Sequence, residues 1–176
     1  MKTLKSSIIT ISSLLLFACN SYRVEVDITP EREAELKQEI IDFKEALSAY
    51  DDSDGSIDLV STVGLARAYE ELGELGKAIK VYEDVLEDGR RSRAVIHNLG
   101  RLYEDVGEYN LAIEQYQRII DEYYENSYLY DITWAYIRAG DRKMAEKFFN
   151  AWQLEFKTTD GQIQDAIKKL REAEGL

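Results

Sequence analysis

One pattern occurs three times between residues 59 and 156, as YEELGELGKAIKVY (69–82), YEDVGEYNLAIEQY (103–116) and YIRAGDRKMAEKFF (136–149). Each copy has an aromatic residue, a glycine four positions later, an alanine five positions after the glycine, and a second aromatic residue another four positions on. The copies begin 34 and 33 residues apart. A period in this range is typical of stacked two-helix units, so the stretch predicts an α-helical repeat array.

Each repeated residue type has a packing reason. Glycine stands where the first helix of each unit should end, because a left-handed cap conformation favours it, at Gly73, Gly107 and Gly140. Small residues recur where neighbouring helices must approach closely, at Ala66, Gly100, Ala78, Ala112 and Ala145. The aromatic residues are expected to fill the remaining space. We therefore interpret them as hydrophobic core and not as a cofactor site.

The three units resemble tetratricopeptide repeats. The second unit follows that family's pattern most fully, with Leu99, Gly100, Tyr103, Gly107, Tyr109, Ala112 and Tyr116. The family's tryptophan position instead holds Thr62, Ile96 and Leu129, and its closing proline is absent. The resemblance implies an all-α fold, an α-solenoid of about three helical hairpins, with the units at residues 59–92, 93–125 and 126–156.

Two further helices are predicted to cover the ends of the array. Residues 31–50 should form an N-terminal capping helix, because Thr29 suits the N-cap and Pro30 the first turn. Residues 160–174 should form a C-terminal capping helix that begins at Thr159 or Asp160. Such helices shield the apolar sides of the terminal units in a repeat array.

The first 18 residues carry the features of a secretory signal peptide. Two lysines precede an apolar run at residues 8–17, which as a helix reaches only about 15 Å, half the thickness of a bilayer core. The run ends in LFAC (16–19), which resembles a bacterial lipobox. The resemblance implies that residues 1–18 are removed and that Cys19, the single cysteine, is acylated.

A membrane-anchored chain is therefore expected. Residues 19–30 would comprise the lipidated Cys19 and an extended tether, because apolar and charged residues alternate there. In the bacterial lipoproteins that the lipobox resembles, an aspartate after the cysteine favours the inner membrane, so Asn20 here implies the outer membrane, facing the periplasm of a bacterial cell envelope. An ordinary signal peptide with a chance cysteine is the alternative.

The composition argues against several classes of function. The formal charge is −12, from 22 basic and 34 acidic residues, and an acidic chain repels nucleic-acid phosphates. We therefore predict no nucleic-acid partner. The chain has one histidine, one cysteine and no glycine-rich phosphate loop, so we expect neither enzyme activity nor a cofactor.

An acidic loop at residues 51–58 resembles part of an EF-hand calcium loop. In that register the first and last ligand positions would hold Tyr50 and Ser61, so the first carboxylate and the final glutamate are missing. Calcium needs that number of ligands, and we predict no metal site. We expect a solvated loop in which Ser56 or Asp58 caps the next helix.

The resemblance also places a binding groove. Helix A of each tetratricopeptide repeat lines a concave surface, where residues one period apart form rows: Val63, His97 and Tyr130; Arg67, Arg101 and Trp134; Glu70, Glu104 and Ile137. Asn98 holds a position that in the family often bonds the backbone of a bound peptide. Two arginines one repeat apart suit a carboxylate ligand, and Trp134 beside Tyr130 suits a binding hot spot.

The alternative for the arginines is local pairing. Arg67 would then pair with Glu70, and Arg101 with Glu104 or Asp105, on their own helices. These residues would stabilise helices and would bind no partner.

Together these patterns predict a membrane-anchored adaptor that binds a protein or peptide in the cell envelope, in assembly or scaffolding. A self-associating structural lipoprotein is the alternative, because the tyrosine-rich stretch at residues 123–130 could pair two copies.

Overall fold

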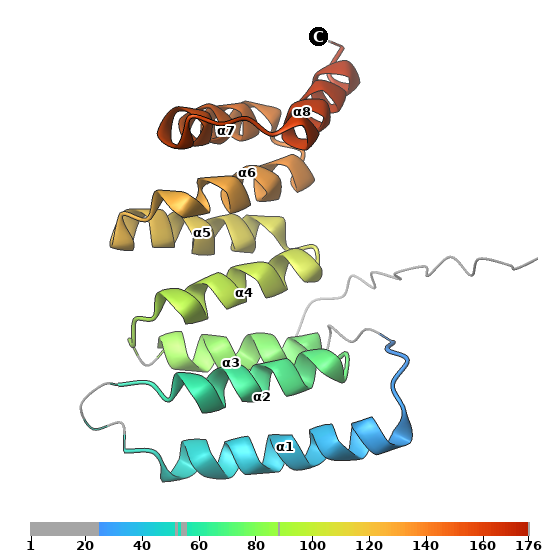
Figure 1. The fold of residues 1–176 in the computed structure, drawn as a ribbon, viewed down its shortest axis with the longest axis vertical. Coiled ribbons are helices and arrows are strands. Elements are labelled where there is room, and N and C mark those ends of the chain that lie inside the picture. The colour runs from blue at the N-terminus through green and yellow to red at the C-terminus, as the bar shows by residue number, and fades with distance from the viewer. Residues whose placement is uncertain (1–24, 52, 54–55, 88, 176) are drawn as a thin grey trace, which may run out of the picture.

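The computed structural model describes residues 25–51, 53, 56–87 and 89–175, and this part of the chain forms helices and no strands. The helices are α1 (Pro30–Ala49), α2 (Leu59–Glu71), α3 (Leu75–Glu87), α4 (Arg93–Asp105), α5 (Tyr109–Tyr123), the 3-10 helix η1 (Asn126–Tyr128), α6 (Leu129–Arg138), α7 (Arg142–Phe156) and α8 (Gly161–Ala173). They stack in chain order from α1 at one end to α7 and α8 at the other (Figure 1). The predicted all-α solenoid is confirmed.

Three helical hairpins make up the stack. They are α2–α3, α4–α5 and α6–α7, and each helix packs mainly on the helices next to it in the sequence. Such neighbour-only packing is the defining property of a solenoid. The helix α1 packs on α2 at one end, and α8 packs on both α6 and α7 at the other.

Local sequence signals set the helix ends. Five helices begin with an N-cap residue whose side chain accepts a hydrogen bond from a backbone amide in the first turn: Thr29, Asp58, Ser92, Asp141 and Asp160. Of the alternatives, Asp58 and Asp160 are therefore the capping residues. The turn glycines within the three hairpins adopt φ values of +71°, +81° and +77°, at Gly73, Gly107 and Gly140. These values lie in the left-handed region that favours glycine.

The repeated aromatic and small residues form the core. Tyr82 is 1% exposed and Tyr116 is 2% exposed, and both pack with residues of the first two hairpins. A Cβ atom added to Gly100 would lie 2.7 Å from Cε1 of Tyr116, so the small residue is needed for the approach. Tyr136 is only partly buried and stacks on Phe148, with ring centroids 5.3 Å apart.

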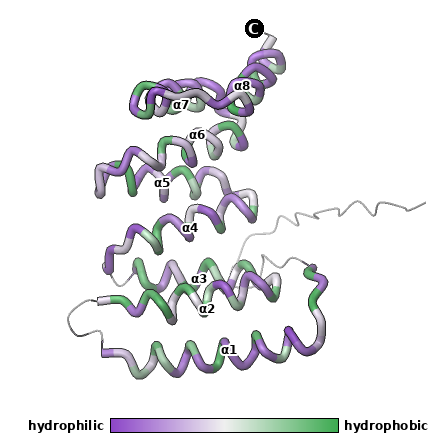
Figure 2. Tube along the Cα trace, in the orientation of Figure 1, coloured by the Kyte–Doolittle hydropathy of each residue, from purple (hydrophilic) through white to green (hydrophobic). Residues whose placement is uncertain are grey.

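A second, smaller core lies between the third hairpin and α8. Ala145 and Phe149 of α7 meet Ile163 and Ile167 of α8. Hydrophobic residues recur at intervals along the helices, with hydrophilic residues between them (Figure 2). This is the pattern of amphipathic helices that bury one side.

Ion pairs reinforce the attachment of α8. Arg142 is 8% exposed, and its guanidinium donates to Glu146 at 2.9 Å and to Glu174 at 2.7 Å. Arg171 of α8 also bonds Glu146, at 2.7 Å. The arginines lower the pKa of Glu146 from its ordinary value, which keeps the carboxylate charged.

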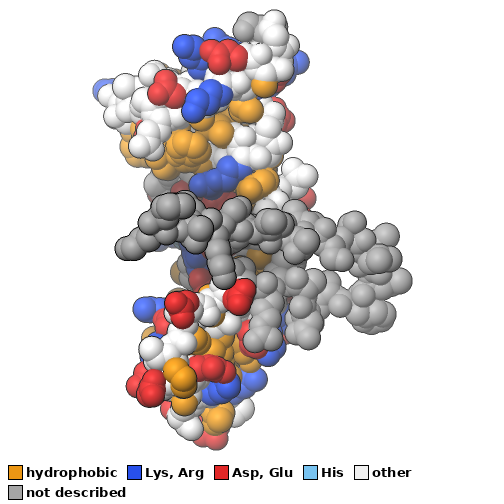
Figure 3. Space-filling model, turned by 90° about the vertical axis from the view of Figure 1, so that its right-hand side faces the viewer, with side chains coloured by type: hydrophobic (Ala, Val, Ile, Leu, Met, Phe, Trp, Pro, Cys, Tyr) orange, Lys and Arg blue, Asp and Glu red, His pale blue; other side chains and the backbone are white. Residues whose placement is uncertain are grey.

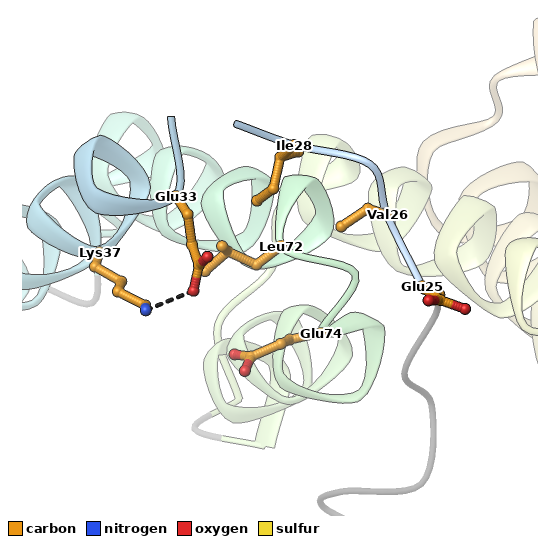
Figure 4. Close-up of a pocket in the computed structure, with 7 residues that line it drawn as sticks. All are labelled: Glu25, Val26, Ile28, Glu33, Lys37, Leu72 and Glu74. Atoms are coloured by element: carbon orange, nitrogen blue, oxygen red, sulfur yellow. Dashed lines mark hydrogen bonds and ion pairs between the residues drawn. The ribbon is translucent and has the colours of Figure 1, made fainter. Parts of the chain in front are cut away.

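The described residues before α1 are extended. Residues 25–29 run beside the turn between α2 and α3 and leave a cavity there, lined by Glu25, Val26, Ile28, Glu33, Lys37, Leu72 and Glu74 (Figure 4). Lys37 pairs with Glu33 at 2.6 Å on α1. Cys19 and the proposed leader lie outside the described residues.

Candidate functional site

The predicted rows lie on α2, α4 and α6, and we call this side of the three helices the A face. Direct contacts between successive helices join it into one surface. Arg101 of α4 reaches Glu70 of α2, and Arg138 of α6 reaches Glu104 of α4. Both pairs connect residues about one repeat apart, so the A face spans all three hairpins.

The first predicted arginine is the more exposed of the two. The Arg67 side chain is 76% exposed and pairs with Glu71 at 3.3 Å, one helical turn along α2. The predicted partner Glu70 is used elsewhere, by Arg101. Local pairing of Arg67 therefore occurs, but with the neighbouring glutamate.

Arg101 already has two carboxylate partners. Its Nη2 lies 2.6 Å from Oε2 of Glu70, and its Nη1 lies 2.9 Å from Oδ2 of Asp105. The pair with Asp105 is one of the predicted alternatives, whereas the bond to the preceding hairpin was not predicted. A ligand carboxylate at Arg101 would have to compete with both acids.

Glu104 is the most enclosed acid of the predicted rows. Its side chain is 14% exposed, and Nη1 of Arg138 lies 2.7 Å from its Oε1. Burial raises the pKa of Glu104, and this effect exceeds the opposite effect of the Arg138 charge. Sequence reasoning missed Arg138, although the period aligns it with the acidic residues Glu71 and Asp105 of the earlier hairpins.

A similar contact continues the series to α1. The guanidinium of Arg32 bonds Glu71 at 2.7 Å and also reaches Glu35 and Glu39 on its own helix. Hydrogen bonding from Arg32 lowers the pKa of Glu71. Three arginines therefore join neighbouring elements. Arg32 joins α1 to α2, Arg101 joins α4 to α2, and Arg138 joins α6 to α4. We interpret this arginine–glutamate series as structural, because each pair holds neighbouring elements together.

The third hairpin carries the apolar part of the A face. Tyr130, Trp134 and Ile137 are partly buried against the second core. Trp134 faces the guanidinium of Arg138, whose Cζ lies 5.8 Å from a ring centroid, within cation–π range. Hydrophobic side chains reach the surface at the level of α6 and α7 (Figure 3).

Tyr130 is held on the side toward α8. Its hydroxyl donates to Oδ2 of Asp160 at 3.3 Å, and its ring lies 5.4 Å from that of Trp152. The expected hot spot of Trp134 and Tyr130 is thus partly built into the packing of α8. Trp134, which contacts the Arg138 guanidinium, is also partly exposed.

The centre of the A face carries His97, Asn98 and Val63. The His97 ring lies 5.1 Å from that of Tyr128, edge to face. Burial and the Arg101 charge lower its pKa, which favours the neutral imidazole. Burial raises the pKa of the Tyr82 hydroxyl, and the neighbouring Asn98 side chain opposes part of that rise. Val63 is partly buried against the main core.

Asp131 is a further A-face residue that the rows did not include. It occupies the repeat position of Gly64 and Asn98, in the first turn of α6. The side chain is half-buried, and no residue in the described part of the chain gives it a hydrogen bond or an ion pair. Burial raises its pKa, against the opposite effect of Arg138.

The described residues offer no site for a metal. Within residues 25–51, 53, 56–87 and 89–175, no three His, Cys, Asp or Glu side chains gather closely enough to ligate an ion. In the acidic loop Asp51 accepts a hydrogen bond from the amide of Ser53, while Asp52, Asp54 and Gly55 lie outside the described residues. Among the described helices, none combines the length and apolar character needed to cross a bilayer.

Comparison with known proteins agrees with this architecture. A family model described as "Tetratricopeptide repeat" matches residues 61–94 and 95–126. Residues 61–126 are therefore similar in sequence to tetratricopeptide repeats. The two matched segments correspond to the first and second hairpins, and no curated protein matches the sequence.

Solved structures show the same fold. One structure of MamA is 18% identical, with a TM-score of 0.60 over 87% of this chain and 88% of that chain. A tetratricopeptide repeat protein from Parabacteroides merdae is 22% identical, with a TM-score of 0.57 over 82% of this chain and 61% of that one. A putative kinesin light chain from Podospora anserina, described as having TPR-like repeats, gives a TM-score of 0.54 at 16% identity, covering 82% and 85%. At these identities the likeness establishes the fold.

Proposed function

We propose that this protein is an adaptor that binds a protein or peptide segment on its A face and serves assembly or scaffolding. The observation that carries the proposal is the third hairpin, where Trp134 and Ile137 stay partly exposed beside Arg138 on a face that spans all three hairpins. Aromatic residues next to arginine are enriched among the residues that dominate binding energy. Tetratricopeptide repeats are in general protein-binding modules and not enzymes, which supports this class of function.

The adaptor is further proposed to be lipid-anchored in a bacterial cell envelope, at the outer membrane facing the periplasm. The residues 16–19, LFAC, and the short apolar run before them support this proposal. In cells, an alkyne-palmitate label should mark the natural chain and should not mark the Cys19→Ser variant. The variant should also be lost from the membrane fraction. Membrane-bound, labelled Cys19→Ser protein would contradict lipidation at this residue.

Photo-crosslinking tests the binding face. Benzoylphenylalanine placed at Arg67, which is 76% exposed, should capture a partner in cells because the side chain lies on the A face and its ion pair with Glu71 is weak. The matched control is the same group at Leu154, which is 81% exposed on α7. Equal capture from both positions would show no preference for the A face.

Self-association is the second candidate. Tyr124 is 88% exposed and Leu154 is 81% exposed, and exposed apolar side chains favour association. A crosslink from position 124 or 154 to a second copy, with a sedimentation coefficient that rises with concentration, would favour this candidate. A monomer at all concentrations with a crosslinked partner at position 67 would favour the adaptor.

A further inference from the structure

The Asp131 carboxylate contributes little to the stability of the fold. It is half-buried in the first turn of α6 without a hydrogen bond or ion pair in the described part of the chain. Burying a charge without a partner opposes folding. The positive end of the α6 dipole offsets only part of that penalty. An amide at this position, as in the equivalent Asn98, would avoid the penalty.

The surroundings of Asp131 are negative and aromatic. Glu104 of α4 is close enough to affect Asp131 electrostatically, and one guanidinium, that of Arg138, faces the two acids. Arg138 forms an ion pair with Glu104 at 2.7 Å, so among the described residues the Asp131 charge has no ion-pair partner of its own. Tyr128 and Trp134 stand three residues before and after Asp131 in the sequence, so helical geometry places them beside it.

We propose that this part of the A face receives a cationic side chain, lysine or arginine, from the bound peptide segment. Asp131 would accept its hydrogen bonds, with Tyr128 and Trp134 against the aliphatic stem. A charge-assisted hydrogen bond in a partly desolvated place is stronger than a neutral one, and arginine also stacks on aromatic rings. The inference rests on the adaptor function proposed above and specifies the chemistry of the partner.

Charge complementarity selects this occupant over the others. An acidic peptide would bring a further negative charge next to Glu104 and Asp131, which are already matched by one arginine. A second copy of this chain carries a formal charge of −12 and is repelled at long range. A basic segment is attracted at long range and at contact.

Selection from a random dodecapeptide library on the purified full-length protein tests the proposal. The selected pool should be enriched in lysine or arginine. Asp131→Asn should weaken binding of the best peptide at least tenfold in fluorescence anisotropy. The matched control is Asp165→Asn, the same change at an exposed position of α8, which should bind like the natural protein. Binding to the natural protein should also weaken as salt is added.

The contrary outcomes separate the two proposals. A pool enriched in acidic peptides, or tight binding unaffected by Asp131→Asn, would overturn the cationic side chain and leave the adaptor function standing. A pool without enrichment of any sequence would overturn both. A lower melting temperature for Asp131→Asn would show that the carboxylate is there to stabilise α6, and would overturn the inference. The salt titration needs no variant, and an affinity that does not change with salt would overturn the cationic side chain.

Discussion

Single glycines determine how closely neighbouring helices approach. A Cβ atom at Gly64 would lie 2.3 Å from the Phe43 ring of α1, and one at Gly100 would lie 2.7 Å from the Tyr116 ring. Both distances are shorter than packed atoms permit, so the neighbouring ring would have to move. Gly161, at the start of α8, has no atom near the equivalent position.

Gly100→Ala is therefore expected to lower the free energy of unfolding by about 1–3 kcal/mol, the usual penalty of overpacking a core. Gly161→Ala should be neutral or stabilise by up to about 1 kcal/mol, because it only restricts the unfolded chain. Urea denaturation of the two variants measures both changes. Similar values for the two positions would contradict the close packing of Gly100 on Tyr116.

Asp131 makes stability depend on pH in a definite direction. Because burial raises its pKa above the ordinary value of 3.8, the folded chain holds the proton more tightly than the unfolded chain. Stability is therefore lost as pH rises from about the ordinary value through the raised pKa, and the loss is complete above it. We expect Asp131→Asn to melt higher than the natural protein at pH 7.5, with a difference that shrinks toward pH 4. Calorimetry at both pH values checks this, and a constant difference would exclude titration of Asp131 as its cause.

Ion pairs within one helix and ion pairs between helices contribute differently to the free energy of unfolding. The Arg67–Glu71 pair lies within α2 and is largely exposed, whereas Arg138 of α6 holds Glu104 of α4, whose side chain is 14% exposed. Exposed pairs within a helix contribute about 0.3–0.5 kcal/mol. Removing the partner of an enclosed carboxylate costs more, because the charge stays behind without compensation.

Arg138→Ala should accordingly destabilise the protein by about 1–3 kcal/mol, and Arg67→Ala by about 0.5 kcal/mol or less. Added salt should reduce the destabilisation by Arg67→Ala by the larger fraction, because exposed ion pairs are screened. Chemical denaturation at low and high salt tests the comparison. A penalty for Arg138→Ala as small as that for Arg67→Ala would show that Glu104 is well solvated.

Across the whole molecule, stability is expected to be local, because each helix packs mainly on its sequence neighbours. The second core joins only α7, α8 and the adjoining residues of α6. Loss of packing there should loosen one end of the solenoid and leave the other end intact. In a globular domain with one core, by contrast, loss of packing at one core residue destabilises the entire fold.

Ile163→Ala tests that locality, since the side chain is fully buried between α8 and α7. We expect a loss of about 2–5 kcal/mol and faster amide exchange in α7 and α8, with α2 and α3 unchanged. The control is Lys168→Ala on the exposed side of α8. Uniformly faster exchange over all hairpins would mean that the array unfolds as one cooperative unit.

The sequence by itself determined the helices, their ends and the hairpin repeat. Helical periodicity, caps such as Asp58 and Asp160, and the glycines at hairpin turns act over a few residues, and the 33- and 34-residue period relates one hairpin to the next. The aromatic residues recur with the same period, and this recurrence indicated the core. Tertiary structure decided which charges meet on the A face. Arg101 had acids at helical spacing on its own helix, yet it also bonds Glu70 of the preceding hairpin, and Arg138 forms an ion pair with Glu104. Among the described residues Asp131 has no hydrogen bond or ion pair, whereas Arg138 of the same helix pairs with Glu104 of the preceding hairpin, and no local pattern predicts that pairing.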